Sequence, residues 1–218
     1  MLRVGFDQPF RPLAWMEGGQ AQGPLIERVR LLLAQAGFQP SFNPYPNEAI
    51  EAALAAGDID LIAFKGILPQ RASSLAFSLP ILRSGTALFL PANGRLGVSG
   101  DITAMEGRLV TTPRRGPLAA LITANYPGVR LLLTGSYEEA LRRVVDGEAA
   151  AAVLNFHVGA YWSRTLALPI VIPPRPFMDV DMAIATRFDL AGQFFPTINA
   201  AIMRVSPLHY ATPPVQVA

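Results

Sequence analysis

The first 64 residues alternate between short apolar runs and segments in which apolar side chains recur three or four positions apart. The first pattern predicts buried strands and the second predicts helices. The predicted elements are a strand at 2–6, a helix at 24–36, a strand at 38–43, a helix at 47–57 and a strand at 60–64. Asn47 is the expected N-cap of the second helix, and Gly37 and Gly57 end the two helices. This order favours a parallel sheet in an α/β lobe.

The same order returns in the second half of the chain. The predicted elements there are a strand at 107–112, a helix at 117–126, a strand at 129–134, a helix at 136–146 and a strand at 149–154. Ser136 and Glu139 form an S-x-x-E capping box at the start of the second of these helices. Residues 47–64 and 137–154 superpose at an offset of 90 positions, which places Gly57 on Gly147. We therefore expect two similar lobes.

The last third of the chain continues with two extended segments and one helix. The segments ALPIVIP and MDVDMAIAT read as strands, and an amphipathic helix is expected from Leu190 to Arg204, with Asp189 as its cap and Pro196 inside it. From Ser206 the tail is rich in proline and shows no helical or strand period.

Several polar residues directly follow the predicted strands. In open parallel sheets, ligands sit at the carboxyl ends of the strands, so these residues mark a candidate ligand site between the two lobes. They are Asp7, Lys65, Arg114, Arg115 and Asn155.

Composition narrows the possible functions. With 51% hydrophobic and 16% charged residues among 218, the chain has the composition of a folded protein rather than a disordered one. The absence of Cys excludes disulfides and thiolate sites, and two histidines make a metal site unexpected, so we expect no metal and no cofactor. A net charge of +2 argues against nucleic acid as a partner. Of 18 basic residues, Lys65 is the single lysine and 17 are arginines.

Two further features of the sequence bear on the cellular compartment of the protein. The longest mostly apolar run, 149–163, is too short and too polar to span a bilayer. Met1 leads directly into a predicted strand, so we expect either a cytoplasmic protein or an exported one whose leader has been removed.

Four segments within residues 2–204 follow one another in a distinctive order: LRVGFDQPFRPLAW, AALAAGDIDLIA, ILPQRASSLAFSLPIL and SYEEALRRVVDGEAAAAVLN. In order and spacing they resemble the type II periplasmic solute-binding proteins, and within them the polar amino-acid binding family (bacterial extracellular solute-binding protein family 3). The resemblance implies two α/β lobes joined by two hinge crossovers, with lobe 1 at 1–91 and 181–218 and lobe 2 at 92–180. It also implies capture of a small solute by closure of the lobes.

The resemblance assigns roles to individual residues. Arg71 matches an arginine that grips the ligand carboxylate, for which a guanidinium fork is suited. Phe10 matches an aromatic that stacks on the ligand, with Trp15 as a second wall. Asp7 lies where the family faces its ligand. The expected ligand-binding set is Asp7, Phe10, Trp15, Lys65, Arg71, Arg115 and Asn155.

Two of these positions concern the second lobe. Arg115 lies in a turn that opens a helix, where backbone N–H groups can hold an anion. Asn155 replaces the family's Asp, which pairs with an α-ammonium. An amide supplies no countercharge, so the cations at Lys65, Arg71 and Arg115 favour an anionic solute without an ammonium.

Several of these residues also have a simpler interpretation that involves no ligand. Asn155 can cap a helix that starts at Phe156. Phe10 and Trp15 can be packing residues, Arg115 can belong to a solvated turn, and Arg71 can be a surface arginine.

Three functions follow from the resemblance. The first is binding of a small polar solute, an amino acid or another carboxylate, for ABC-type uptake. The second is a ligand-sensing module of a membrane receptor with a kinase or cyclase. The third is a lyase or dehydratase on the same fold. Because Asp7 is the only carboxylate expected in the cleft, we favour a non-enzyme. Its partners would then be the solute and either a permease or receptor domains, and its location periplasmic or extracellular.

Overall fold

The structure, a computed structural model, describes residues 1–93 and 101–205, which form two compact units. Unit 1 consists of residues 1–83 and the described residues from 180 on, and unit 2 of those between 84 and 179. The proline-rich tail expected from Ser206 lies outside the described residues. The lobe boundaries expected from the sequence stay a prediction.

Unit 1 is built on a sheet in which β1 lies between two parallel neighbours. Its elements are β1 (Leu2–Asp7), β2 (Trp15–Glu17), β3 (Gln20–Gln22), α1 (Pro24–Gln35), β4 (Pro40–Tyr45), α2 (Ile50–Ala56), β5 (Leu61–Gly66), α3 (Pro69–Ala72), the first part of β6 (Ala76–Pro91), the end of β11 (Met178–Thr186) and α7 (Phe188–Arg204). Strands β4 and β5 flank β1, and both run parallel to it. Strand β11 adds to β5 in the antiparallel direction, and β2 and β3 form a separate hairpin. The expected parallel βαβαβ sheet is confirmed.

Unit 2 repeats this arrangement around β7. Its elements are the second part of β6, η1 (Ile102–Met105), β7 (Leu109–Pro113), α4 (Leu118–Asn125), β8 (Arg130–Thr134), α5 (Tyr137–Val145), β9 (Ala151–Asn155), α6 (Phe156–Thr165), β10 (Ile170–Val171) and the start of β11. Strands β8 and β9 flank β7 and run parallel to it, while β6 pairs with β9 in the antiparallel direction. The strand that begins the βαβαβ segment therefore lies between the other two parallel strands in both units.

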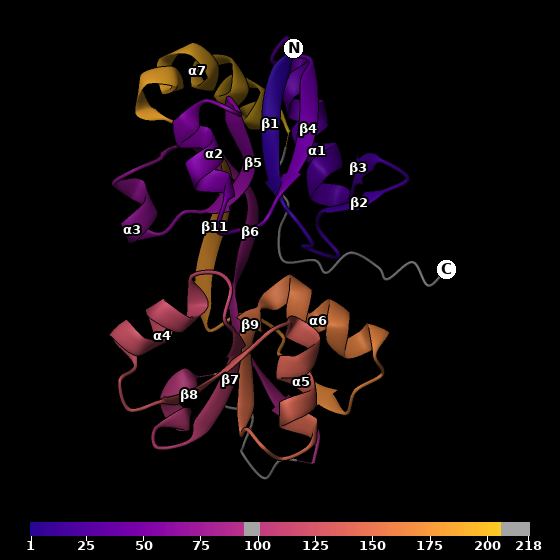
Figure 1. The fold of residues 1–218 in the computed structure, drawn as a ribbon, viewed down its shortest axis with the longest axis vertical. Helices are drawn as coiled ribbons and strands as arrows, with labels where there is room; N and C mark the ends of the chain where they lie inside the picture. The colour runs from indigo at the N-terminus through magenta and orange to yellow at the C-terminus, as the bar shows by residue number, and fades with distance from the viewer. Residues whose placement is uncertain (94–100, 206–218) are drawn as a thin grey trace. The chain divides into compact units, whose positions relative to one another are not determined.

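The chain passes from one unit to the other twice. It leaves unit 1 within β6, after Arg83, and returns within β11, at Val180. Both passages are parts of long strands, which can be followed in Figure 1. This is the mixed α/β architecture with two crossovers that the sequence predicts.

Two glycines at equivalent positions end helices in the two units. Gly57 follows α2 with φ of 80°, and Gly147 lies just beyond α5 with φ of 76°. This left-handed conformation is disfavoured for residues with a Cβ atom, so glycine is the residue that suits both stops. The offset of 90 positions found in the sequence thus corresponds to a real structural repeat. At the same offset, Lys65 at the end of β5 corresponds to Asn155 at the end of β9.

Each unit has a core of its own. In unit 1, α2 buries Ile50 and Leu54 against Ile62 of β5. In unit 2, Val110 of β7 and Val153 of β9 lie in one apolar cluster with residues of other elements. None of the helices in residues 1–93 and 101–205 combines the length and hydropathy that crossing a bilayer requires.

Three helix starts can be compared with the sequence-based expectation. The expected cap of α2 is wrong: the helix begins at Ile50 with Ala49 as N-cap and has no side-chain cap. A turn precedes the helix, in which the Pro46 carbonyl accepts from the N–H groups of Ala49 and Ile50, while the Asn47 side-chain amide donates to Asp7. Helix α7 begins at Phe188 rather than Leu190, and the Asp189 carboxylate accepts hydrogen bonds from the Arg187 guanidinium instead of capping the helix.

The third start, that of α5, agrees with the sequence. The Ser136 hydroxyl accepts a hydrogen bond from the Glu139 backbone N–H at 3.1 Å. The reciprocal arm of the box differs, since the Glu139 carboxylate accepts from the N–H of Gly135 at 2.8 Å. Other element ends agree with the expected ones to within about two residues, the usual uncertainty of such boundaries.

Candidate ligand-binding site

Two cations of unit 1 share a single carboxylate oxygen. Lys65 lies near the end of β5, and Arg71 lies on α3, whose first turn is preset by Pro69. The Arg71 Nε donates to Glu51 Oε1 at 3.0 Å, and the Lys65 Nζ lies 3.4 Å from the same oxygen. The Lys65 side chain is 3% exposed and that of Arg71 12%, whereas that of Glu51 is 36% exposed. Two weakly solvated cations therefore meet at one partly solvated acid.

Backbone carbonyl groups hold the two cations in place. The Arg71 guanidinium also donates to the Gly66 carbonyl oxygen at 3.4 Å, and the Lys65 ammonium donates to the Asn47 carbonyl oxygen at 3.4 Å. Gly66 has little spare room, because a Cβ atom there would lie 2.9 Å from a Val180 methyl group. The cations are thus fixed by the end of β5 and by the loop before α2.

Asp7 supplies the second acid of this cluster. It ends β1, and its carboxylate accepts a hydrogen bond from the Asn47 side-chain amide at 2.6 Å. Burial raises the pKa of Asp7, although the Asn47 hydrogen bond and the charges of Lys65 and Arg71 oppose the rise. We refer to Asp7, Asn47, Glu51, Lys65 and Arg71 as the charge cluster. The two carboxylates and the two cations of the cluster give a formal net charge of zero.

The pKa of Lys65 moves in the opposite direction. Burial lowers it, and repulsion from Arg71 adds to the effect, while Asp7 and Glu51 oppose it. Desolvation therefore penalises the charged form of both Asp7 and Lys65. An incoming anion that approached Lys65 and Arg71 would relieve part of the penalty on Lys65. The arrangement is suited to holding a carboxylate or a similar anion.

Replacing Asp7 by Asn tests the raised pKa through stability. Because the folded-state pKa lies above the ordinary value of 3.8, the stability that Asp7 contributes is complete below that value and is lost as pH rises through the folded-state pKa. We expect the stability of Asp7→Asn relative to wild type to increase between about pH 4 and pH 7. Urea unfolding at several pH values measures this. The exposed Asp58, changed to Asn, is the control, and equal pH profiles for the two variants would contradict the expectation.

Phe10 lies close to this cluster in the chain but packs into the core. Its ring stacks on Phe64, with ring centroids 5.7 Å apart and planes inclined by 24°. Phe10 is also buried, and it forms an isolated bridge with Ala14. The packing alternative therefore describes its present contacts, and a ligand-stacking role stays a prediction.

Trp15 is engaged by polar partners. Its indole N–H donates to the Glu17 carboxylate at 2.9 Å, and the Arg11 guanidinium lies 4.5 Å from the centre of its ring. The cation–π contact occupies one face of the indole. This geometry does not indicate a ligand contact, so the role of Trp15 as an aromatic wall of the ligand site also stays a prediction.

The remaining predicted residues belong to unit 2. Arg115 is exposed in the turn before α4, next to Gly116, which has φ of 98°. Asn155 ends β9 and caps α6: its side-chain oxygen accepts from the N–H groups of His157 and Val158 at 3.1 and 3.2 Å. Its amide also donates to the Ser84 hydroxyl at 3.1 Å. The capping alternative for Asn155 is confirmed, and a ligand contact at this position stays a prediction.

Unit 1 thus brings Asp7, Lys65 and Arg71 together and adds two residues that the sequence did not single out for the site. Asn47 was expected to cap a helix, and Glu51 carried no signal beyond being an acid on a helix. Their roles depend on contacts across 40 and 20 positions of sequence. In the described part of the chain, no three His, Asp or Glu side chains gather in a way that would hold a metal ion.

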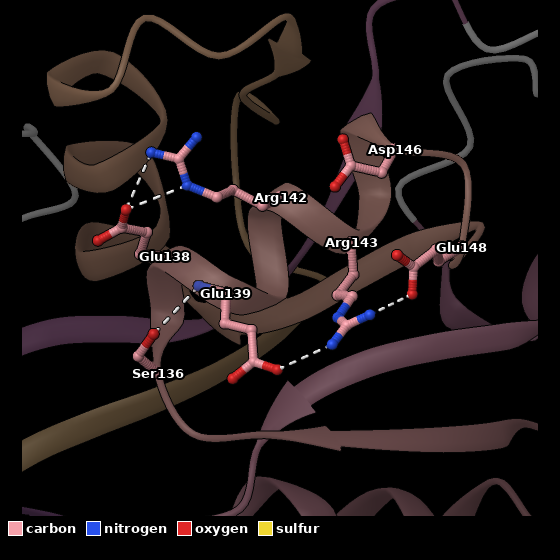
Figure 2. Close-up of a pocket in the computed structure, with 7 residues that line it drawn as sticks. All are labelled: Ser136, Glu138, Glu139, Arg142, Arg143, Asp146 and Glu148. Atoms are coloured by element: carbon pink, nitrogen blue, oxygen red, sulfur yellow. Dashed lines mark hydrogen bonds and ion pairs between the residues drawn. The ribbon is translucent and has the colours of Figure 1, made fainter.

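A shallow hollow on α5 holds none of the predicted residues. Figure 2 shows its lining: Ser136, Glu138, Glu139, Arg142, Arg143, Asp146 and Glu148. Arg142 pairs with Glu138 at 2.9 Å, and Arg143 pairs with Glu139 and Glu148. These pairs are exposed, so solvent and salt screen them and they contribute little to stability. The hollow is a charged surface of α5 and the turn that follows it.

Comparison with known families decides the class of the protein. A family model described as bacterial extracellular solute-binding proteins, family 3, matches residues 2–201. The chain belongs to this family. This family 3 protein is also 25% identical over 144 residues to the virulence sensor protein BvgS of Bordetella pertussis. The aligned part is 64% of this chain and 11% of BvgS, so the chain spans a small part of that relative's length.

Solved structures show the same fold. The periplasmic VFT2 domain of BvgS from B. pertussis has a TM-score of 0.79 at 22% identity, covering 94% of this chain and 88% of that domain. A histidine kinase sensor domain similar to periplasmic binding proteins has a TM-score of 0.81 at 21% identity, covering 93% and 89%. The arginine-bound form of truncated ArgBP from T. maritima has a TM-score of 0.77 at 18% identity, covering 94% and 96%. The family 3 chain therefore has the two-lobe Venus flytrap fold, and the resemblance inferred from its sequence is confirmed.

Proposed function

We propose that this family 3 protein binds a small solute that carries a carboxylate, and that Lys65 and Arg71 supply the positive side of the site. The observation that carries the proposal is the pair of weakly solvated cations on one oxygen of Glu51. Holding two cations away from water is costly unless anionic groups compensate them. A ligand carboxylate is such a group, and the planar guanidinium of Arg71 favours it.

Asp7, Phe10 and Trp15 complete the proposed unit 1 part of the site, and Arg115 and Asn155 the unit 2 part. The last two are proposed on the family resemblance alone. Asn155 would act through a neutral amide that is already engaged as a helix cap. The proposed solute is therefore held mainly by unit 1, and it needs no ammonium group.

We also propose that the chain is the ligand-sensing module of a membrane receptor, acting in the periplasm. The similarity to BvgS and to a histidine kinase sensor domain supports this. Delivery of a solute to an ABC-type permease is the second candidate, which the family description supports. A binding role rather than catalysis is supported by the same relatives.

Thermal unfolding of the wild-type protein tests solute binding. The probes are acetate, succinate, L-glutamate and L-arginine, each added at increasing concentration. A probe present at 100 times its Kd stabilises the protein by about 2.7 kcal/mol, which raises the Tm by several degrees. We expect succinate or glutamate to raise it most. If no probe changes the Tm, the proposed carboxylate site is wrong.

The complete reading frame separates the two physiological roles. A frame that continues into a membrane helix and a kinase or cyclase domain is expected for a receptor. A frame that ends with this module, next to genes for a permease and an ATPase, would contradict the receptor role and leave the solute-binding proposal unaffected.

A further inference from the structure

The carboxylate of Glu51 lies where a ligand carboxylate would have to bind. Its Oε1 atom accepts from the Arg71 Nε at 3.0 Å and lies 3.4 Å from the Lys65 ammonium. Among the guanidinium nitrogens of Arg71, Glu51 binds the Nε, and it also lies beside the Lys65 ammonium. An anion that used the Nε edge of Arg71 together with Lys65 would need the space around this oxygen and would therefore compete with Glu51.

The two cations and Glu51 differ in how firmly their surroundings hold them. Lys65 belongs to strand β5, and Arg71 is tied to the Gly66 carbonyl oxygen, so both cations are held by the backbone around them. Glu51 lies in the first turn of α2 with 36% of its side chain exposed. A rotation about its side-chain bonds would take the carboxylate into water without moving the helix. Glu51 is the partner that can leave.

Exchange at this site preserves the charge balance. Asp7 and Glu51 balance Lys65 and Arg71 in the charge cluster. When a ligand carboxylate replaces that of Glu51, the buried cations keep two acids, and the displaced carboxylate is solvated. Asp7 stays in place through the hydrogen bond from the Asn47 amide. Lys65 and Arg71 therefore face two carboxylates both before and after exchange.

From this geometry we infer that Glu51 is an intramolecular competitor, whose carboxylate holds the Nε edge of Arg71 and the Lys65 ammonium and must be displaced before a solute carboxylate can use both groups. The inference rests on the proposed function. Its consequence is a reduced apparent affinity, since only the fraction of molecules with Glu51 displaced is competent to bind. A solute with one carboxylate and no other polar group makes the same contacts as the Glu51 carboxylate, so its binding displaces Glu51 with little net gain in free energy. Solutes with a second anionic or polar group are favoured.

Replacing Glu51 by Gln removes the competing charge and keeps the size of the side chain. Isothermal titration with succinate and L-glutamate gives the Kd of each variant. We expect the Kd of the better probe to fall about tenfold in Glu51→Gln. This is the change that results if Glu51 is displaced in about one tenth of the wild-type molecules and only those molecules can bind. Glu138→Gln is the matched control, because Glu138 also holds an arginine through one oxygen but lies on the exposed face of α5. Its Kd is expected to equal that of the wild type.

The possible results separate this inference from the proposed function. Binding to the wild type with an unchanged Kd in Glu51→Gln overturns the inference and leaves the function standing. An equal gain in Glu138→Gln overturns it too, since net charge would then explain the effect. Binding to Glu51→Gln alone supports both ideas. If no probe binds either protein, both are wrong. Glu51→Ala, which lacks the whole carboxylate arm, is the second variant, and the same gain is expected from it should Glu51→Gln fold poorly.

Discussion

Replacing Arg71 by Met is expected to weaken binding of succinate or L-glutamate about 100-fold, because two charge-assisted hydrogen bonds to the carboxylate are lost. Methionine keeps much of the length and the apolar stem of arginine, so packing around α3 changes little. Lys65 would remain as the single cation of the cluster, and Glu51 would then pair with it more closely. Isothermal titration measures the change in Kd, and urea unfolding verifies that the variant is folded.

Two further variants give this expectation its controls. Arg71→Lys keeps the charge but lacks the planar fork, so an intermediate Kd is expected. Arg142→Met removes an exposed arginine that binds Glu138 through its Nε and a terminal nitrogen, and it should leave the Kd unchanged. An Arg71→Met protein that binds the probes as tightly as the wild type would remove Arg71 from the site.

Replacing Phe64 by Ala is expected to lower the free energy of unfolding of unit 1 by about 4 kcal/mol. Phe64 is 1% exposed and stacks on Phe10, so the change opens a cavity in the core of unit 1. Trp15 lies in unit 1 and Trp162 in unit 2. In a Trp162→Phe background, tryptophan fluorescence therefore follows urea unfolding of unit 1 alone.

The matched control for Phe64→Ala is Phe188→Ala in the same background. Phe188 lies at the start of α7 and is 58% exposed, so its loss should change the free energy of unfolding by about 0.5 kcal/mol or less. Phe64→Leu is expected to fall between the two. Similar losses for Phe64→Ala and Phe188→Ala would show that the Phe10–Phe64 stack contributes little.

The sequence predicts the fold because its signals are local. Apolar periodicity determines where strands and helices lie, and glycines such as Gly57 and Gly147 mark helix ends whose left-handed backbone is disfavoured for other residues. The capping box at Ser136 is equally local, and it is present in the structure. These features involve residues a few positions apart, and the structure agrees with them.

The site contacts that the sequence did not reveal involve partners distant in sequence, whereas the wrong cap at Asp189 involves Arg187, two positions away. Asn47 is a good N-cap in isolation, but its amide binds Asp7, 40 positions earlier. Glu51 looks like any acid on the first turn of a helix, and only the approach of α3 to α2 brings it to Arg71. Asn155, in contrast, acts on the next residues of the chain, so its capping role was predictable. Tertiary contacts thus decide which polar side chains remain available locally.

The position of the only lysine has a consequence for covalent chemistry. Lys65 carries the sole side-chain amine of the sequence, and it lies under Glu51 with 3% of its side chain exposed. An acylating reagent can reach this amine only when the cluster opens. Acylation located at Lys65 by mass analysis of its peptide would therefore report opening of the cluster, undisturbed by any other lysine.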